Sequence, residues 1–177
     1  MTDAEPFTRV YDTHHRQVYA YAVTRAGRDH ADDVVADTFL VAWRRVRDLP
    51  AAPLPWLLGV ARNVARERFR DEVRQSAIAA ELRAWIREAE DDVAEHVTDR
   101  AAVLVALGTL SEDDREVLTL TAWHGLSARD AARVVGCSTA TFFVRLHRAR
   151  KRLQDAMSST STAGRRTGFT FAEEYSR

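Results

Sequence analysis

Residues 111–153 read SEDDREVLTLTAWHGLSARDAARVVGCSTATFFVRLHRARKRL, and they contain three short segments with helical spacing, separated by tight turns. Gly125 and Gly136 stand in the two turns, where glycine is favoured. Each segment follows a residue that can accept a hydrogen bond from a first-turn amide, as helix N-caps do: Ser111, Ser127, and Ser138 or Thr139. Two short helices joined by a glycine-containing turn are typical of a DNA-binding helix-turn-helix, although helical hairpins that bind nothing share the pattern.

The third segment, which we expect to end near Leu153, has two different faces. At about 100° per residue, its apolar residues fall on one narrow arc, which we predict to be buried: Phe142, Leu146, Ala149 and Leu153. The opposite arc has small side chains at its start and cations further on. A helix in a major groove needs this distribution, because small or apolar groups meet base edges while cations reach bases and phosphates. A solvated basic face would look similar, but the pattern favours DNA reading. This face consists of Ala140, Val144, His147, Arg148 and Lys151, with Thr141 at its edge.

The charges are unevenly distributed along the chain. The formal net charge is zero, with 26 basic and 26 acidic side chains. Residues 76–114 carry 3 basic and 10 acidic side chains, a net charge of −7, whereas residues 115–177 carry 11 and 5, a net charge of +6. Positions 131–154 contain six arginines or lysines and no acid. Such a local excess suits a surface that contacts phosphates, with a solvated helix face as the ordinary alternative.

Helical periodicity also dominates the N-terminal half of the chain. Apolar residues recur at helical spacing from Phe7 to Ala22, and Gly27 is a suitable C-terminal stop. We expect a second helix from about Asp29 and a third after the prolines that break the chain at 50–55. The sequence therefore predicts an all-α fold with two small helical domains: an N-terminal helical bundle at 1–75 and a helix-turn-helix domain at 101–156, joined by an acidic linker at 76–100 and followed by a flexible tail at 157–177.

Composition excludes several classes of protein. Apolar residues make up 46% and charged residues 29%, as in folded soluble proteins. No apolar run approaches the roughly 20 residues of a membrane span, and we expect no signal peptide and no membrane insertion. Cys137 is the only cysteine, which excludes an internal disulfide framework and indicates a reduced, cytoplasmic protein. The histidines show no metal-site spacing, and we find no glycine-rich phosphate loop or nucleophile motif, so we predict no cofactor, no metal and no enzymatic activity.

Several blocks of the C-terminal half resemble a known family. Residues 110–118 and 125–127, together with Thr141 and residues 145–150, look like region four of bacterial extracytoplasmic-function (ECF) sigma factors. The N-terminal half resembles the same family independently. Residues 31–39 with Trp43 resemble the helix that grips the polymerase clamp. Trp56-Leu57 and residues 61–63 resemble the helix that handles the −10 promoter element. The resemblance covers about residues 5–155.

The resemblance implies a transcription initiation factor. Its partners would be core RNA polymerase, promoter DNA and an anti-sigma factor. The N-terminal domain would melt and hold the −10 element, and the C-terminal domain would read the −35 element. The core-polymerase-binding residues would be Asp33, Val34, Asp37, Phe39 and Trp43. The −10 residues would be Trp56, Arg62, Asn63, Arg66 and Arg70. The −35 residues would be Ser138, Ala140, Thr141, Phe143, Val144, Arg145, His147, Arg148 and Lys151.

The chain departs from the family pattern at three positions. Ala36 stands where the clamp motif usually has a glutamine, and Phe143 and Val144 stand where the family commonly has polar or basic residues. Phe143 lies between the two faces of its helix, so it either packs at the edge of the buried arc or contacts a thymine methyl group. We hypothesise that −35 recognition depends on thymine methyls and DNA shape, with Arg148 and His147 as the main polar readers.

Two other functions stay open from the sequence. The first is a helix-turn-helix regulator that binds duplex DNA without polymerase, and the block at 31–43 argues against it. The second is a sigma-like decoy that acts only through protein contacts, which the departures at Ala36 and Phe143 keep open.

Overall fold

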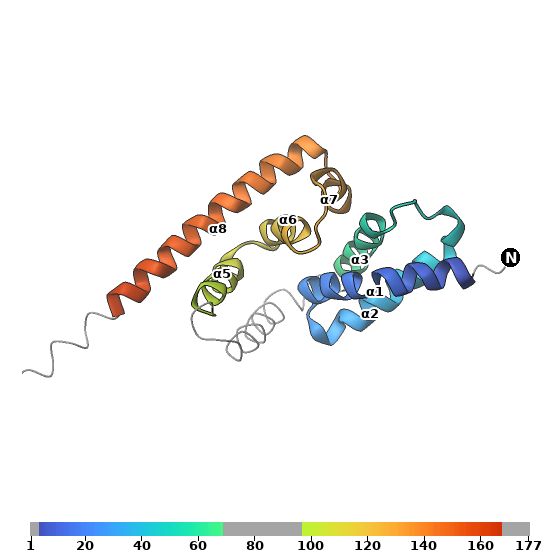
Figure 1. Cartoon of the computed structure of the whole chain (residues 1–177), viewed down its shortest axis with the longest axis horizontal. Coiled ribbons are helices and arrows are strands. Elements are labelled where there is room, and N and C mark those ends of the chain that lie inside the picture. Colours follow the sequence, from blue (N-terminus) through green and yellow to red (C-terminus); the bar gives the residue numbers. More distant parts are fainter. Residues whose placement is uncertain (1–3, 69–96, 168–177) are drawn as a thin grey trace, which may run out of the picture.

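The fold is all-helical, as predicted. The computed structural model describes residues 4–68 and 97–167, and every regular element in these ranges is a helix. The helices form an N-terminal and a C-terminal domain that lie side by side (Figure 1). Figure 1 shows the last helix running away from the N-terminal domain.

The N-terminal domain is a bundle of three helices that pack against one another. They are α1 (Ala4–Ala26), α2 (Arg28–Arg44) and α3 (Leu54–Arg68). Gly27 joins α1 to α2 with a φ of 79°, a conformation that glycine adopts without the steric cost of a Cβ atom. The helix stop predicted at Gly27 is therefore confirmed. The core of the bundle includes Val18, Tyr21, Val34, Phe39, Leu57 and Leu58.

The proline-rich loop between α2 and α3 is short and ordered at both ends. It begins with the 3-10 turn η1 (Val46–Asp48). The amide of Leu57 donates to the carbonyl of Pro53 at 2.9 Å, which starts the hydrogen-bonding of α3. Pro55 lies in the first turn of α3, where its missing N–H has no intrahelical acceptor to lose.

The C-terminal domain has the predicted helix-turn-helix order. Its helices are α5 (Val97–Thr109), α6 (Glu112–Ala122), α7 (Ala128–Val135) and α8 (Thr139–Thr167). The three expected caps are confirmed, with serine at the third: the hydroxyls of Ser111, Ser127 and Ser138 accept hydrogen bonds from the amide three residues on, at 3.2, 3.1 and 3.1 Å. Gly136 ends α7 in a left-handed conformation with a φ of 71°.

The predicted buried arc of α8 holds this domain together. Phe142 and Ala149 are fully buried, Leu146 is 5% exposed and Leu153 is half-buried against the core, and α8 packs across α5, α6 and α7. Arg152 of α8 also donates to the carboxylate of Asp114 on α6 at 2.7 Å. At the end of α5, the Arg115 guanidinium donates to the carbonyls of Leu107, Gly108 and Leu110, which supplies partners to acceptors that a helix C-terminus leaves free.

The helix α8 is longer than its apolar pattern indicates. The prediction that it ends near Leu153 is wrong, because α8 continues to Thr167 and takes in the first eleven residues of the predicted tail. Extending a helix costs no new nucleation step, and residues 154–163 contain no proline or glycine that would stop it. Residues 168–177 lie outside the described residues.

The two domains touch, which the sequence did not predict. Helix α3 packs against α7, and the buried apolar residues of both domains form one continuous cluster. Most of the predicted linker, residues 76–96, lies outside the described residues, and its last four residues belong to α5. The domain boundaries at 75 and 101 therefore stay a prediction.

Candidate polymerase and promoter interfaces

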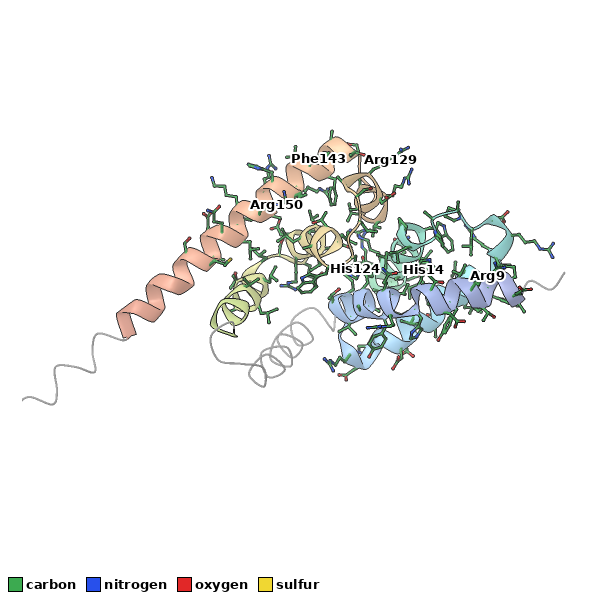
Figure 2. All side chains as sticks on the ribbon, in the orientation of Figure 1. Arg9, His14, His124, Arg129, Phe143 and Arg150 are labelled. Carbon is green, nitrogen blue, oxygen red and sulfur yellow. The ribbon has the colours of Figure 1, made fainter. Side chains whose placement is uncertain are left out.

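The residues that we expected to read the −35 element lie on the outer face of α8, except Ser138, which caps the start of that helix. All nine are exposed. Phe143 is 56% exposed and Val144 is 50% exposed, although Phe142 between Thr141 and Phe143 is fully buried. The sequence left two roles open for Phe143, and its exposure favours contact with a partner over packing in the core. Figure 2 labels Phe143 and Arg150 on this helix.

The cations of α7 and α8 whose side chains the structure describes include both paired and unpaired groups. Arg152 pairs with Asp114, and Arg133 of α7 pairs with Asp130 at 2.9 Å. Four further cations have no carboxylate within ion-pair distance among the described residues: Arg145, Arg148, Arg150 and Lys151. Exposed, unpaired cations along one helix can approach phosphates without first breaking an ion pair.

The predicted polymerase-binding residues are split between the surface and the interior of the N-terminal domain. Asp33 is exposed, Trp43 is 44% exposed, and Asp37 is half-buried. Val34 and Phe39, by contrast, are 0% and 3% exposed. These two residues shape the surface from below, because a partner that docks on the closed bundle cannot reach them.

An aromatic cluster supports this surface, and the sequence did not identify it as a unit. The ring of Phe7 on α1 meets Trp43 on α2 edge to face, with centroids 5.0 Å apart. The ring of Tyr11 lies 4.7 Å from that of Phe39. Tyr11 and Leu40 are 37% and 46% exposed, so they join Trp43 in an apolar patch across α1 and α2. Helical periodicity alone could not find this patch, because Phe7 and Tyr11 also fit a core stripe.

The predicted −10 residues do not all share one environment. Asn63 and Arg66 are exposed on α3, and Trp56 is half-buried against the core. Arg70 lies outside the described residues. The side chain of Arg62 is only 12% exposed, and its Nε donates to both carboxylate oxygens of Glu116 on α6, at 3.0 and 3.2 Å.

Comparison with protein families identifies both domains. A model of Sigma-70 region 2 matches residues 10–75, and a model of Sigma-70 region 4 matches residues 100–153. The residues expected to read the −35 element lie within the matched region 4, and those expected to bind polymerase lie within the matched region 2. A helical chain with both regions in this order is a sigma factor, the class of protein that gives RNA polymerase its promoter specificity.

Comparison with individual sigma factors shows to which family of sigma factors the chain belongs. The chain is 36% identical over 149 residues to the ECF RNA polymerase sigma factor BldN of Streptomyces coelicolor, covering 76% of this chain and 53% of BldN. It is 33% identical to the ECF sigma factor EcfG of Rhodopseudomonas palustris, covering 76% of this chain and 75% of EcfG. It is 35% identical to the sigma factor CnrH of Cupriavidus metallidurans, covering 73% and 74%. The chain belongs to the extracytoplasmic-function family of RNA polymerase sigma factors.

Solved structures agree with this assignment. CnrH in complex with the cytosolic domain of CnrY matches with a TM-score of 0.62 at 28% identity, covering 86% of this chain and 88% of CnrH. The sigma factor RpoE in complex with the anti-sigma factor NepR from Bartonella quintana matches with a TM-score of 0.59 at 26% identity, covering 86% and 96%. No helix in residues 4–68 or 97–167 is long and apolar enough to cross a membrane.

Proposed function

We propose that this chain binds core RNA polymerase and directs it to promoters whose −35 element is read by α8. The observation that carries the proposal is the outer face of α8 with its cap Ser138, where nine exposed residues combine apolar, hydroxyl and unpaired cationic groups. Duplex DNA presents thymine methyls, base-edge acceptors and phosphates, which match those groups in kind. The match to Sigma-70 region 2 argues against the alternative of a regulator that acts without polymerase.

We assign the α1–α2 surface to core polymerase. Asp33 and Trp43 are exposed there, next to Tyr11 and Leu40. Large aromatic side chains beside a few charged groups are typical of the residues that dominate binding at protein interfaces. The exposed Asn63 and Arg66 of α3 are assigned to the melted −10 strand, where an amide can meet a base edge and a cation can follow the phosphates.

Co-elution with purified core RNA polymerase in gel filtration tests the proposal. The wild-type chain is expected to co-elute, and the double variant Asp33→Ala with Trp43→Ala is expected to lose most of the binding. Both side chains are exposed, so the bundle keeps its core. The control is Asp12→Ala, which removes an exposed carboxylate from α1. Equal co-elution of all three proteins would refute the assigned surface, and failure of the folded wild-type chain to bind even at a large excess of polymerase would refute the function.

We further propose that an anti-sigma protein binds the chain, because the matched CnrH and RpoE structures are complexes with CnrY and NepR. The chain would act in the cytoplasm, where RNA polymerase works, and would contribute recognition and strand separation rather than catalysis. Co-purification of the chain from its own cells, with and without inducing stress, tests for such a partner.

A further inference from the structure

A buried carboxylate connects the two domains. The side chain of Glu116 on α6 is 1% exposed. Its partners among the described residues all come from the N-terminal domain. Tyr21 of α1 donates its hydroxyl, Arg62 of α3 donates its Nε, and the Nη1 of Arg25 lies 3.9 Å from a Glu116 oxygen. We call these four residues the interdomain cluster.

The burial of Glu116 is compatible only with the closed arrangement of the domains. A carboxylate removed from water without partners is strongly unfavourable, and here the compensating donors belong to the other domain. Burial and the neighbouring Glu116 carboxylate raise the pKa of Tyr21, so its hydroxyl stays protonated and donates. When the domains separate, water can solvate the carboxylate again. Glu116 therefore favours one particular packing of the domains and disfavours others.

A second contact crosses the same interface. The ring of His124, at the turn between α6 and α7, meets the ring of Tyr21 edge to face with centroids 5.7 Å apart. Figure 2 shows His124 where the two domains meet. His124 and Trp123 also line a cleft whose other wall is α1, including Arg16 and Tyr19.

The closed arrangement is incompatible with simultaneous binding to both promoter elements. The −10 and −35 elements are about 25 base pairs apart, which is roughly 85 Å along the duplex. In the closed chain, α3 packs against α7 and α7 packs against α8. The start of the reading helix is therefore about two interhelical spacings, roughly 20 Å, from the −10 helix. The domains must separate to cover the remaining distance.

Arg62 is unavailable to DNA in the closed arrangement. Its Nε is bonded to Glu116, and only 12% of its side chain is exposed. Asn63 and Arg66 on the same helix remain exposed. The domain contact thus occupies one member of the −10 set and leaves its neighbours accessible.

We propose that the closed arrangement is an autoinhibited state of this sigma factor, held by the interdomain cluster, and that opening releases Arg62 and lets the two domains reach their separate promoter elements. The inference rests on the proposed function, since it assumes that the open chain is the form that binds polymerase and promoter. The apparent affinity for polymerase is then the affinity of the open form multiplied by the fraction of molecules that are open.

Two variants weaken the cluster without touching the assigned polymerase or DNA surfaces. Tyr21→Phe keeps the buried ring and removes one donor to Glu116, and Glu116→Gln removes the charge at nearly constant shape. The matched control is Tyr19→Phe, which removes the hydroxyl of a half-buried tyrosine on the same helix that is not part of the interdomain cluster. Circular dichroism establishes whether each variant is folded. If Glu116→Gln does not fold, Tyr21→Phe alone tests whether the interdomain cluster holds the domains closed.

The variants are compared by small-angle X-ray scattering and by titration with core RNA polymerase. We expect the wild-type chain and Tyr19→Phe to be compact, and Tyr21→Phe and Glu116→Gln to have a larger radius of gyration and about tenfold tighter polymerase binding. An extended wild-type chain, or cluster variants as compact as wild type, would overturn the inference. Open variants with unchanged polymerase affinity would show that closure is not inhibitory. Open variants that bind no polymerase would instead overturn the proposed function.

Discussion

The adjacent residues Phe142 and Phe143 allow the two faces of α8 to be separated experimentally. Phe142 is 0% exposed and Phe143 is 56% exposed. Truncating Phe142 to Ala leaves a cavity and is expected to cost about 3–5 kcal/mol of unfolding free energy. Truncating Phe143 removes less than half of a buried phenylalanine contact and is expected to cost about 1 kcal/mol or less. The total free energy of unfolding of a small domain is roughly 5–15 kcal/mol, so Phe143→Ala stays folded.

The contribution of Phe143 to DNA binding can be measured by removing the thymine methyls. A −35 duplex is first selected with wild-type holoenzyme, and each thymine is then replaced by deoxyuracil, which differs only by the methyl group. We expect the replacement at the contacted position to weaken wild-type binding by about 1 kcal/mol, or roughly fivefold. Phe143→Ala holoenzyme should bind the thymine duplex about as weakly, with little further loss on the uracil duplex. Anisotropy titrations of both proteins on both duplexes give the four affinities of a double-mutant cycle, which measures the coupling between Phe143 and the methyl group.

Two results would refute the reasoning. Equal losses for the wild type and Phe143→Ala on the uracil duplex would mean that another residue contacts the methyl. A selected −35 sequence identical for the wild type and Phe143→Lys would mean that this position does not contribute to readout.

The remaining predictions concern single side chains. Arg148→Ala should weaken −35 binding and lower the slope of log affinity against log salt by about 1, because one phosphate or base contact is lost, whereas Arg150→Ala, at a position that is also exposed, should change both less. Titrations at several salt concentrations measure the affinity and the slope. Burial lowers the pKa of His124, so the unfolded chain takes up the proton first and stability should fall as the pH drops below about 6.5. Denaturation at about pH 7.5 and about pH 5.5 should show a smaller loss for His124→Phe than for the wild type, and equal losses would contradict the burial argument. Ser127→Ala removes the cap of α7 and should cost about 1 kcal/mol in chemical denaturation, while a change below about 0.3 kcal/mol would mean that water replaces the hydroxyl.

Local features of the C-terminal domain were predictable from the sequence. A serine cap needs only an amide three residues away, so the positions of Ser127 and Ser138 already indicated the starts of α7 and α8. The buried arc of α8 followed from helical spacing, because the side chains of Phe142, Leu146 and Ala149 must point the same way. The exposure of the opposite arc was then a geometric consequence. What that arc binds stays a proposal.

Contacts between distant parts of the chain were not predictable in the same way. The bond between Tyr21 and Glu116 joins residues 95 positions apart, and Arg62 reaches Glu116 across 54 positions. The helical spacing within α3 predicted where Arg62 lies on the helix but not which residue it contacts. One signal was present: Glu116 is four residues before the fully buried Leu120, so a carboxylate stands on a face that is otherwise apolar. A buried carboxylate is unfavourable without partners, so its presence on this face predicts hydrogen-bond or ion-pair partners from other elements.

The chemistry of Glu116 also explains why a contact of this kind suits a reversible change of state. A leucine at position 116 would be buried in the closed chain and exposed to water in the open chain, so the hydrophobic effect would oppose opening. A carboxylate has a favourable state on both sides, with Tyr21 and Arg62 as partners when closed and with water when open. The free-energy difference between the two states is then the small remainder of two large terms. A partner with a modest preference for the open form, such as core polymerase, is sufficient to shift the population.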